Sequence, residues 1–386
     1  MALIRQYSLL LKLSLSTLPQ RRAAALTILV ATACVIGVLL SMLSATAGVV
    51  QAFRTATDPH IAVVLPDKSL FDDGDGLSRE VIGTILDAPG MARDPDGKVL
   101  GDAEVLFFTP PVRPIASGGY LRVRGMGALG AAIRPGFRLV SGRMFESGRQ
   151  ELIVGVGTQR AFGLNIGDNV RLREGAWPIV GVFAADGVNA NELMGDVDTL
   201  AAMMHRSGYG SVQARLKDPA QLANFRQWLI TNPALKVTAE TQQSYFDRIV
   251  AGESEYFTAM AYLAGAILSI GALFGLVNIF YGIVRARARE MAILRAIGYG
   301  ALPVAASVVF EALLLALLGA LVGAAASWLL FGGREFMVSQ NIYRLLITPR
   351  LVATGIGWAL ALALAGSLLP AIRAGRQQVI QALRAT

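Results

Sequence analysis

Four long stretches with almost no charged side chains divide this chain into apolar and polar parts. A helix needs about 20 apolar residues to cross the hydrocarbon layer of a membrane. Each stretch meets that length, so the pattern predicts four membrane-spanning helices, one before and three after a large polar block. The stretches lie between Arg22 and Arg54 (31 residues), between Glu255 and Arg285 (29 residues), at 296–333, where Glu311 is the single charge, and at 351–372.

The polar block between the first two spans has the patterns of a mixed α and β domain. A helix that begins near Gln242 is expected to run unbroken into the second span. Prolines and glycines cluster at 110–119 and 125–136, where we expect a junction between two subdomains. The predicted strands are Ile61–Leu65, Val105–Thr109, Tyr120–Val123, Glu151–Gly155, Val212–Leu216 and Val237–Ala239, with helices at Leu77–Leu86 and Ala220–Ile230 and a hairpin around Glu174-Gly175.

The fold class that follows is an α-helical membrane domain of four transmembrane helices in a 1+3 arrangement. An α+β extracytoplasmic domain is inserted between helices 1 and 2. The predicted parts are an amphipathic elbow helix (1–22), span one (23–53), the outer domain (54–255, possibly two subdomains), span two (256–284), a short basic segment (285–301), span three (302–331), a short outer loop (332–350), span four (351–372) and a tail (373–386).

The distribution of charge predicts which parts face the cytoplasm. Lys and Arg near the ends of spans tend to stay inside, and the N-terminal segment, the 285–301 segment and the tail are all basic. Both termini are therefore predicted to be cytoplasmic. The polar block has 21 basic and 24 acidic residues, a net of −3, while the rest has 14 and 3, a net of +11, which together give the +8 of the chain. The excess of positive charge thus reflects membrane topology and does not indicate nucleic-acid binding.

One alternative concerns the first span. Ala45-Thr46-Ala47 could be a signal-peptidase site, but the apolar stretch before it is about twice the usual length of a signal core. We therefore expect this span to be retained.

The chain contains few of the residues and motifs that usually carry out catalysis. Its single cysteine, Cys34, lies in the first span, and it has two histidines, so neither a disulfide framework nor a thiol or histidine metal site is expected. It contains neither a G-x-x-x-x-G-K-[ST] phosphate loop nor a G-x-S-x-G nucleophile motif. We predict no catalytic residue, no metal ligand and no cofactor bound by this chain.

The segment Arg285–Gly298 is the most informative one. It is basic and has high helix propensity, and Met291, Ile293, Leu294 and Ile297 are predicted to form an apolar stripe, with Gly298 as a C-cap. Such a helix can dock in a groove on a partner protein. The alternative is a solvated loop that only supplies positive charge.

Residues 289–298, Arg-Glu-Met-Ala-Ile-Leu-Arg-Ala-Ile-Gly, resemble the R-E-x-A-I-L-R-A-x-G signature of FtsX/MacB-type (type VII) ABC transporter permeases. Glu311 followed by Gly319 and Gly323 is similar to the third span of that family. Further similarities lie at Pro370-Ala371 through Ala382-Leu383-Arg384, at Gly142-Arg143 through Asp168, and at Val180-Gly181-Val182. In size the chain resembles the DevC group, whose members lack a fused ATPase.

The resemblance implies a permease subunit in the bacterial inner (cytoplasmic) membrane. A separate dimeric ATPase subunit would bind ATP and Mg, and its motion would be transmitted to the outer domain for export or extraction of an envelope substrate. A second permease copy or paralogue is implied, with a periplasmic adaptor or lipoprotein as a possible further partner, alongside the lipid bilayer. The residues implied in contact with the ATPase are Arg289, Glu290, Ala292, Ile293, Leu294, Arg295, Ile297 and Gly298.

Two intramembrane features complete the prediction. Glu311 is a carboxylate inside a span, which is costly without a partner, so it either senses movement of the 285–301 segment or makes a structural hydrogen bond. The pairs Gly271/Gly275 and Gly319/Gly323 have the spacing that permits close helix approach. We expect dimer contact at the first pair and packing within the subunit at the second.

Two other functions stay open. One is an FtsX-like transmembrane signalling subunit that activates a periplasmic cell-wall hydrolase. The other is a receptor that works without an ATPase.

Overall fold

The computed structural model describes residues 22–111, 120–173, 175–297, 300–338 and 341–376. The chain forms two compact units, which we call the helical unit (Met1–Ala47, Glu255–Arg334 and Leu345–Thr386) and the sheet unit (Gly48–Ser254 and Glu335–Arg344). The predicted elbow helix before residue 22 and the tail after residue 376 lie outside the described residues.

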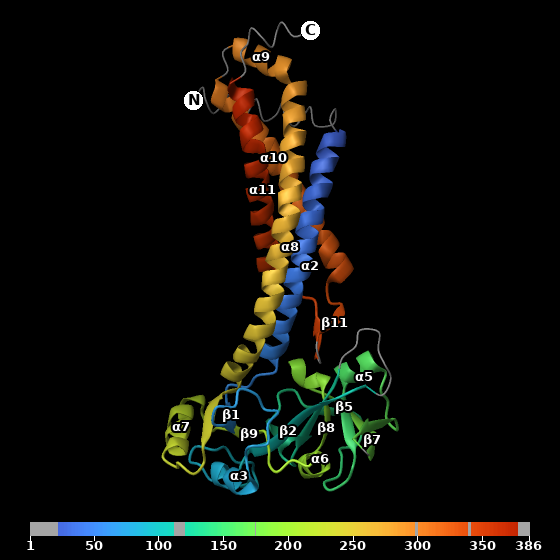
Figure 1. The fold of residues 1–386 in the computed structure, drawn as a ribbon, viewed down its shortest axis with the longest axis vertical. Helices are drawn as coiled ribbons and strands as arrows, with labels where there is room; N and C mark the ends of the chain where they lie inside the picture. The colour runs from blue at the N-terminus through green and yellow to red at the C-terminus, as the bar shows by residue number, and fades with distance from the viewer. Residues whose placement is uncertain (1–21, 112–119, 174, 298–299, 339–340, 377–386) are drawn as a thin grey trace. The chain divides into compact units, whose positions relative to one another are not determined.

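The helical unit is built from long apolar helices that run side by side (Figure 1). Within the described residues, four helices are long and apolar enough to cross a membrane: Arg22–Thr55, Gln242–Ala286, Ala301–Phe331 and Pro349–Gly375. They lie in α2 (Arg22–Thr55), α8 (Gln242–Ala286), α10 (Ala301–Phe331) and α11 (Pro349–Arg376), and the short α9 (Ala288–Ala296) follows α8.

Small residues allow α2 and α10 to approach closely. A Cβ added at Gly323 would lie 2.5 Å from the carbonyl oxygen of Ala33, and one at Gly319 would lie 2.9 Å from that of Leu29. Real Cβ atoms are essentially never found at such distances, so a larger residue at either position would force the two helices to shift. Ser327 Oγ, one turn beyond Gly323, donates to Gly37 O at 3.0 Å.

The sheet unit contains a ten-stranded sheet within the described residues, in the order β10-β1-β9-β2-β3-β8-β5-β7-β4, with β6 paired to β7. Neighbours are antiparallel except for β3 with β8 and β5 with β7. The strands are β1 Ile61–Pro66, β2 Gly101–Thr109, β3 Leu121–Met126, β4 Arg138–Gly142, β5 Leu152–Gly155, β6 Asn169–Leu172, β7 Gly175–Ala184, β8 Leu193–Asp196, β9 Ser211–Arg215 and β10 Val237–Thr241.

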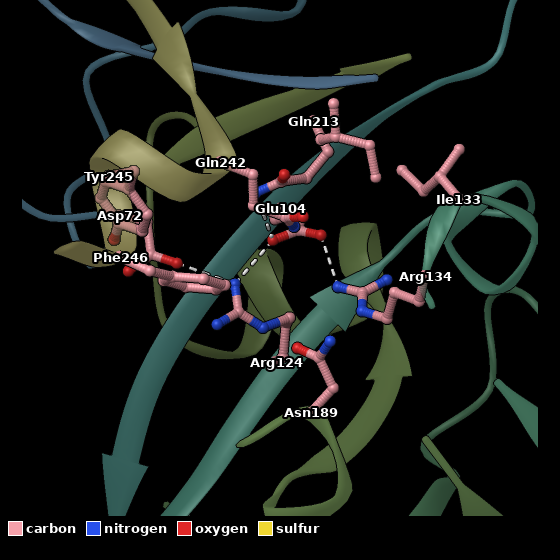
Figure 2. Close-up of a pocket in the computed structure, with 11 residues that line it drawn as sticks. Asp72, Glu104, Arg124, Ile133, Arg134, Asn189, Gln213, Gln242, Tyr245 and Phe246 are labelled. Atoms are coloured by element: carbon pink, nitrogen blue, oxygen red, sulfur yellow. Dashed lines mark hydrogen bonds and ion pairs between the residues drawn. The ribbon is translucent and has the colours of Figure 1, made fainter. Parts of the chain in front are cut away.

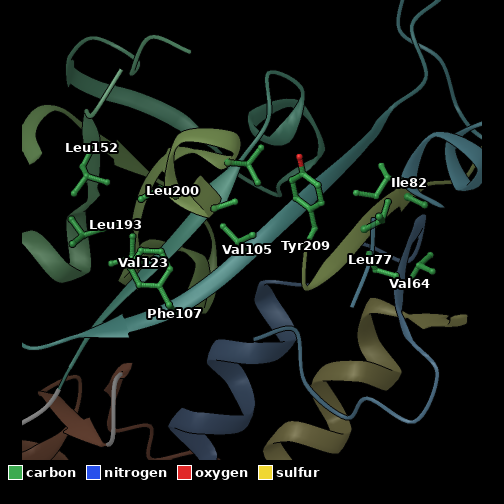
Figure 3. Close-up of a cluster of buried hydrophobic side chains, with 14 of the residues drawn as sticks. Val64, Leu77, Ile82, Val105, Phe107, Val123, Leu152, Leu193, Leu200 and Tyr209 are labelled. Carbon is green, nitrogen blue, oxygen red and sulfur yellow. The ribbon is translucent and has the colours of Figure 1, made fainter. Parts of the chain in front are cut away.

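Short helices cover this sheet and close its core. Figure 3 shows one part of the core, where Val105, Phe107 and Val123 of neighbouring strands meet Leu200. The remaining elements are α3 Arg79–Leu86, α4 Gly130–Ile133, α5 Val156–Phe162, η2 Gly187–Asn191, α6 Val197–Met203, η3 Pro219–Gln221, α7 Leu222–Ile230, and the antiparallel pair β11 Glu335–Val338 and β12 Asn341–Arg344.

Many of the predicted elements of the polar block are present. The strand before α5, the β6–β7 hairpin and the start of helix at Asp218 are confirmed, and the Asp218 side chain accepts a hydrogen bond from Ala220 N. The predicted helix at 77–86 begins later, because Ser78 caps it and Leu77 instead bridges to Tyr209.

Other elements were missed. The segment 332–350 was predicted to be a loop but contains β11 and β12. The prediction also lacked β4 and β8. Strand β4 is exposed along its length and β8 has only four residues, so neither shows the alternation of apolar and polar residues that identifies a strand. The first half of β2 pairs with β9 and its second half with β3. The junction expected near 110–119 and 125–136 stays a prediction.

Candidate functional site

The short helix α9 is held to the helical unit by charged side chains. Arg287, the residue between α8 and α9, places its Nε 3.1 Å from the carboxylate of Glu290 and its Nη1 3.2 Å from that of Glu311 in α10. The side chains of Arg287 and Glu311 are each 5% exposed. Glu311, the carboxylate predicted to lie inside a span, is therefore paired with Arg287, the residue directly before α9.

A third attachment joins α9 to α11. Arg295 Nη1 donates to the carbonyl oxygen of Gly375 at 2.8 Å. On the same helix Met291 and Ala292 are buried, and Met291 packs in a core with Val304 of α10 and Ala371 of α11. These contacts join α9 to α10 and α11, and Arg287 N, directly before α9, donates to Ile283 O of α8 at 3.0 Å.

Other side chains of α9 and its C-cap are exposed. Ile293 is 43% exposed and Ile297 is 72% exposed, and Arg289 and Glu290 are exposed beside them. Residues 289, 293 and 297 follow the i, i+4, i+8 spacing of one helix face. We call Arg289, Glu290, Ile293 and Ile297 the outer face of α9.

The predicted apolar stripe is therefore divided between two faces. Met291 and Ala292 are turned into the core of the chain itself, whereas Ile293 and Ile297 are turned away from it. The side chain of Leu294 and the predicted cap Gly298 lie outside the described residues. An i, i+4 apolar pair flanked by charges is suited to docking in a groove of a partner protein.

The two glycine pairs have different surroundings. Gly319 and Gly323 pack against α2, as described above. A Cβ added at Gly271 or Gly275 of α8 would meet nothing within 4 Å. This part of α8 therefore presents an open surface in the single chain.

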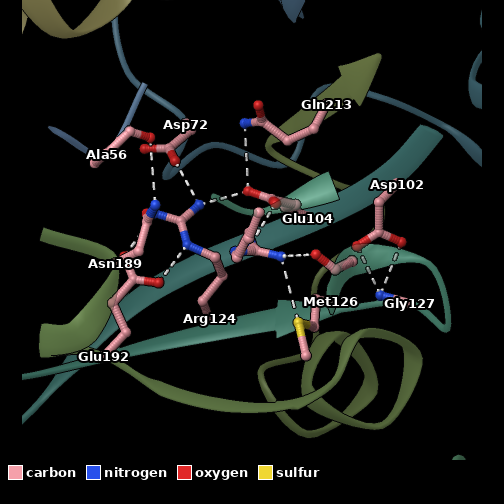
Figure 4. A network of polar contacts seen from close by, with 12 residues as sticks. Ala56, Asp72, Asp102, Glu104, Arg124, Met126, Gly127, Asn189, Glu192 and Gln213 are labelled. Carbon is pink, nitrogen blue, oxygen red and sulfur yellow. Dashed lines mark hydrogen bonds and ion pairs between the residues drawn. The ribbon is translucent and has the colours of Figure 1, made fainter. Parts of the chain in front are cut away.

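A second polar arrangement, a buried charge cluster, lies in the sheet unit (Figures 2 and 4). At its centre, Arg124 of β3 contacts Glu192 through Nε at 2.7 Å, Glu104 at 2.6 Å and Asp72 at 2.8 Å. Arg122 pairs with Glu192 at 3.0 Å, and Arg134 pairs with Glu104 on its other side. We call these residues and Asp102 the buried charge cluster.

The electrostatics of this cluster are those of a buried ion-pair network. Burial alone would raise the pKa of Asp72 and Glu192, but the facing Arg124 and Arg122 outweigh it, so both pKa values lie below the ordinary range. Asp102 differs, because burial and then the charge of Glu104 raise its pKa to about 7. The amide of Gly127 donates to both of its oxygens, at 2.9 and 3.0 Å.

The space beside this cluster is too small for a ligand. The cavity lined by Asp72, Glu104, Arg124 and Tyr245 measures about 20 Å³, and one water needs about 10–15 Å³. The cluster thus joins β2, β3 and Glu192 through ion pairs and does not form a ligand site. Sequence reasoning missed it, although Asp102/Glu104 and Arg122/Arg124 each place two charges on one face of a strand.

Two models of known families match the chain. A model of the FtsX-like permease C-terminal region matches residues 262–379. A model of the MacB-like periplasmic core domain matches residues 23–231, which is more than half of the chain. No protein with a curated description matched.

Two solved structures match part of this chain at low identity. The crystal structure of the periplasmic region of MacB from Actinobacillus actinomycetemcomitans is 12% identical, covers 52% of this chain and 97% of its own, and has a TM-score of 0.39. The crystal structure of the extracellular domain of the noncanonic ABC-type transporter YknZ from Gram-positive bacteria is 13% identical to this chain. It covers 47% of this chain and 100% of its own length, and has a TM-score of 0.36.

Proposed function

From the premise that this chain belongs to the FtsX/MacB-type permeases of ABC transporters, we propose that it transmits the motion of a separate ATPase subunit to its sheet unit. Permeases of this family are membrane proteins that work with ABC ATPase partners. In our proposal the ATPase dimer binds ATP and Mg and docks on the outer face of α9. A second permease copy or paralogue completes the assembly.

The observation that carries this proposal is the division of α9 into two faces. Its inner side is joined to α8, α10 and α11 through Arg287, Arg295 and Met291, while Ile293 and Ile297 are left exposed. A force applied to the exposed pair would therefore act on three long helices at once. One of these, α8, continues from β10 of the sheet unit without a break between Thr241 and Gln242.

We further propose the topology and the task. The helices α2, α8, α10 and α11 would cross the bacterial inner membrane in a 1+3 arrangement with both termini in the cytoplasm. The sheet unit would then lie outside, where its movement serves export or extraction of an envelope substrate. The helical segments offer few polar side chains for a solute pathway besides Glu311, which supports work done outside the membrane.

The alternative function uses the same geometry. A signalling subunit would transmit the same motion to a periplasmic cell-wall hydrolase and export nothing. A hydrolase recovered on the sheet unit, with no adaptor and no transported substrate, would favour this alternative.

The experiment that tests the docking step replaces both exposed isoleucines of α9. Fully burying one such side chain contributes about 1.5–3 kcal/mol, and Ile293 and Ile297 still have 43% and 72% of their surface to bury. Docking would then draw at least about 1.7 kcal/mol from the pair, so the double variant Ile293→Asp/Ile297→Asp should weaken ATPase binding by at least about fifteenfold. Both positions are exposed, so folding should be retained. The assay is co-purification of the co-expressed ATPase subunit from membranes, with thermal stability of the permease measured in parallel.

The matched control is Ile166→Asp in the sheet unit, where the isoleucine is also exposed at 47%. It should leave co-purification unchanged. If the α9 double variant retains the ATPase as fully as this control does, the docking surface lies elsewhere and the proposal is wrong.

A further inference from the structure

Two exposed arginines mark the level at which the uncharged stretches of α8 and α11 end. Arg285 is the first charged residue after Glu255 in α8, and Arg373 is the first after Arg350 in α11. Both arginines are exposed. An uncharged stretch of about 20 residues spans the hydrocarbon layer of a membrane. Arg285 and Arg373 therefore lie where the hydrocarbon layer gives way to the polar headgroups.

The two helices run side by side to this level. Trp358 Nε1 of α11 donates to Ser269 Oγ of α8 at 2.8 Å. Further along the same two helices, the guanidinium carbon of Arg373 lies over the ring of Tyr281, 5.1 Å from its centre. Arg285 follows Tyr281 at the i, i+4 spacing, which places two side chains on one helix face. We call Arg285, Arg373 and Tyr281 the boundary site.

The helical unit supplies little negative charge to this site. Its acidic residues are Glu255, Glu290 and Glu311. Glu290 and Glu311 are both paired with Arg287. Glu255 is separated from Arg285 by 29 residues of the same helix, which is about 45 Å along its axis. The anion that balances the boundary site therefore comes from another molecule.

The depth of the boundary site favours a phospholipid as the source of that anion. The headgroups of a bilayer lie directly outside the hydrocarbon layer, and tyrosine is enriched at the same level because it has an apolar ring and a polar hydroxyl group. Planar guanidinium groups match the oxygens of a phosphate, and basic pockets between membrane helices bind anionic headgroups. A soluble partner would instead meet the outer face of α9, which follows α8 in the chain.

A simpler role exists for one of the two arginines. Arg285 lies in the last turn of α8, where a cation offsets the negative end of the helix dipole. That role involves Arg285 alone and predicts no selectivity for the charge of a lipid. It does not account for Arg373, which is placed over Tyr281 of the neighbouring helix.

We propose that the boundary site binds the phosphate group of an anionic phospholipid. Tyr281 holds the guanidinium group of Arg373 in place, and Arg373 and Arg285 both donate to the phosphate oxygens. The inference goes beyond the proposed function, because it requires neither the ATPase nor a transported substrate. It rests only on α8 and α11 crossing the membrane.

The test uses the full chain purified in a neutral detergent. Phosphatidylglycerol or phosphatidylcholine with identical acyl chains is added, and native mass spectrometry measures the binding of each lipid. Wild type should bind phosphatidylglycerol at least about tenfold more tightly, since each arginine near the surface favours an anionic lipid. This preference should shrink at high salt. Inorganic phosphate should displace the lipid no more than chloride does at equal ionic strength.

Variants of the protein locate the binding. Arg285→Gln/Arg373→Gln should lose about tenfold of the preference for phosphatidylglycerol. The matched control, Arg334→Gln/Arg350→Gln, removes two other exposed arginines of the helical unit and should keep the preference. Tyr281→Leu should weaken binding about threefold, whereas Tyr281→Phe should not, because its ring still faces Arg373.

The proposal is overturned if the two lipids bind equally well to wild type, if Arg285→Gln/Arg373→Gln keeps the preference, or if the control variant loses it to the same extent. The last result would show that any pair of basic residues attracts the lipid. Displacement by inorganic phosphate would also overturn it, since free phosphate would then be the ligand. If the double variant fails to fold, Tyr281→Leu decides.

The lipid assay is independent of the proposed function. It contains no ATPase, so its failure leaves the α9 docking result untouched, and the reverse also holds. A double variant that loses the ATPase but keeps the lipid preference would assign Arg285 and Arg373 to the protein partner and would overturn the lipid site.

Discussion

The buried pair between Arg287 and Glu311 offers the sharpest test of how α9 is joined to the spans. In Glu311→Gln the shape of the side chain is kept but its charge is lost, so the guanidinium of Arg287, 5% exposed and 3.2 Å away, faces a neutral amide. Removing one partner of a buried ion pair costs about 3–5 kcal/mol when the other charge is left without a partner. Arg287 keeps its contact with Glu290, so we expect a smaller cost and a thermal midpoint a few degrees below that of wild type.

A double variant separates stability from transmission. Replacing both members, as in Arg287→Met/Glu311→Leu, removes the two buried charges together, and such replacements are often neutral or stabilising. We therefore expect its midpoint to return close to that of wild type. The ATPase should still co-purify, because the outer face of α9 is unchanged.

The assay for transmission is hydrogen–deuterium exchange along α8 in the assembled complex, with and without nucleotide. Wild type should show a nucleotide-dependent change in exchange, and the stable double variant should show a reduced one, because its α9 has lost the charged contact to α10. Two results would refute this reasoning. One is a Glu311→Gln variant with unchanged midpoint, assembly and ATPase activity. The other is a double variant whose exchange responds to nucleotide as wild type does.

Three further predictions use other parts of the chain. Gly323→Ala should lower the thermal stability of the purified permease by about 1–3 kcal/mol through overpacking, because its Cβ would lie 2.5 Å from a backbone oxygen, whereas Gly271→Ala should be neutral in the single chain. Arg124→Met leaves three buried carboxylates without their main partner, so it should expose the sheet unit to limited proteolysis. Asp102 has its pKa raised to about 7 from an ordinary value of 3.8, so the folded state holds the extra proton and wild type should lose stability as pH rises from about 4 to about 7. Asp102→Asn should show a smaller loss over that window in pH-dependent melting curves, and equal slopes for the two proteins would contradict the assignment.

Sequence reasoning succeeded where one segment carries its own pattern. The uncharged stretches predicted the four long apolar helices, and local turn chemistry predicted the hairpin around residue 175 and the helix start at Asp218. Glu311 was expected to need a partner. The sequence did not show that this partner is Arg287, because 24 residues separate the two and their contact depends on how α9 folds back on α10.

The sequence by itself determined which segments are apolar enough to cross a membrane, since that property depends on composition over about 20 consecutive residues. It also predicted the short helix α9, since helix propensity is a local property. Only the tertiary structure decided which of its apolar residues turn inward, that β10 ends the sheet, and that the charges on β2 and β3 meet around Arg124. These outcomes depend on contacts between segments that are distant in sequence. The free energy of such contacts cannot be derived from the hydrophobic pattern of either segment alone.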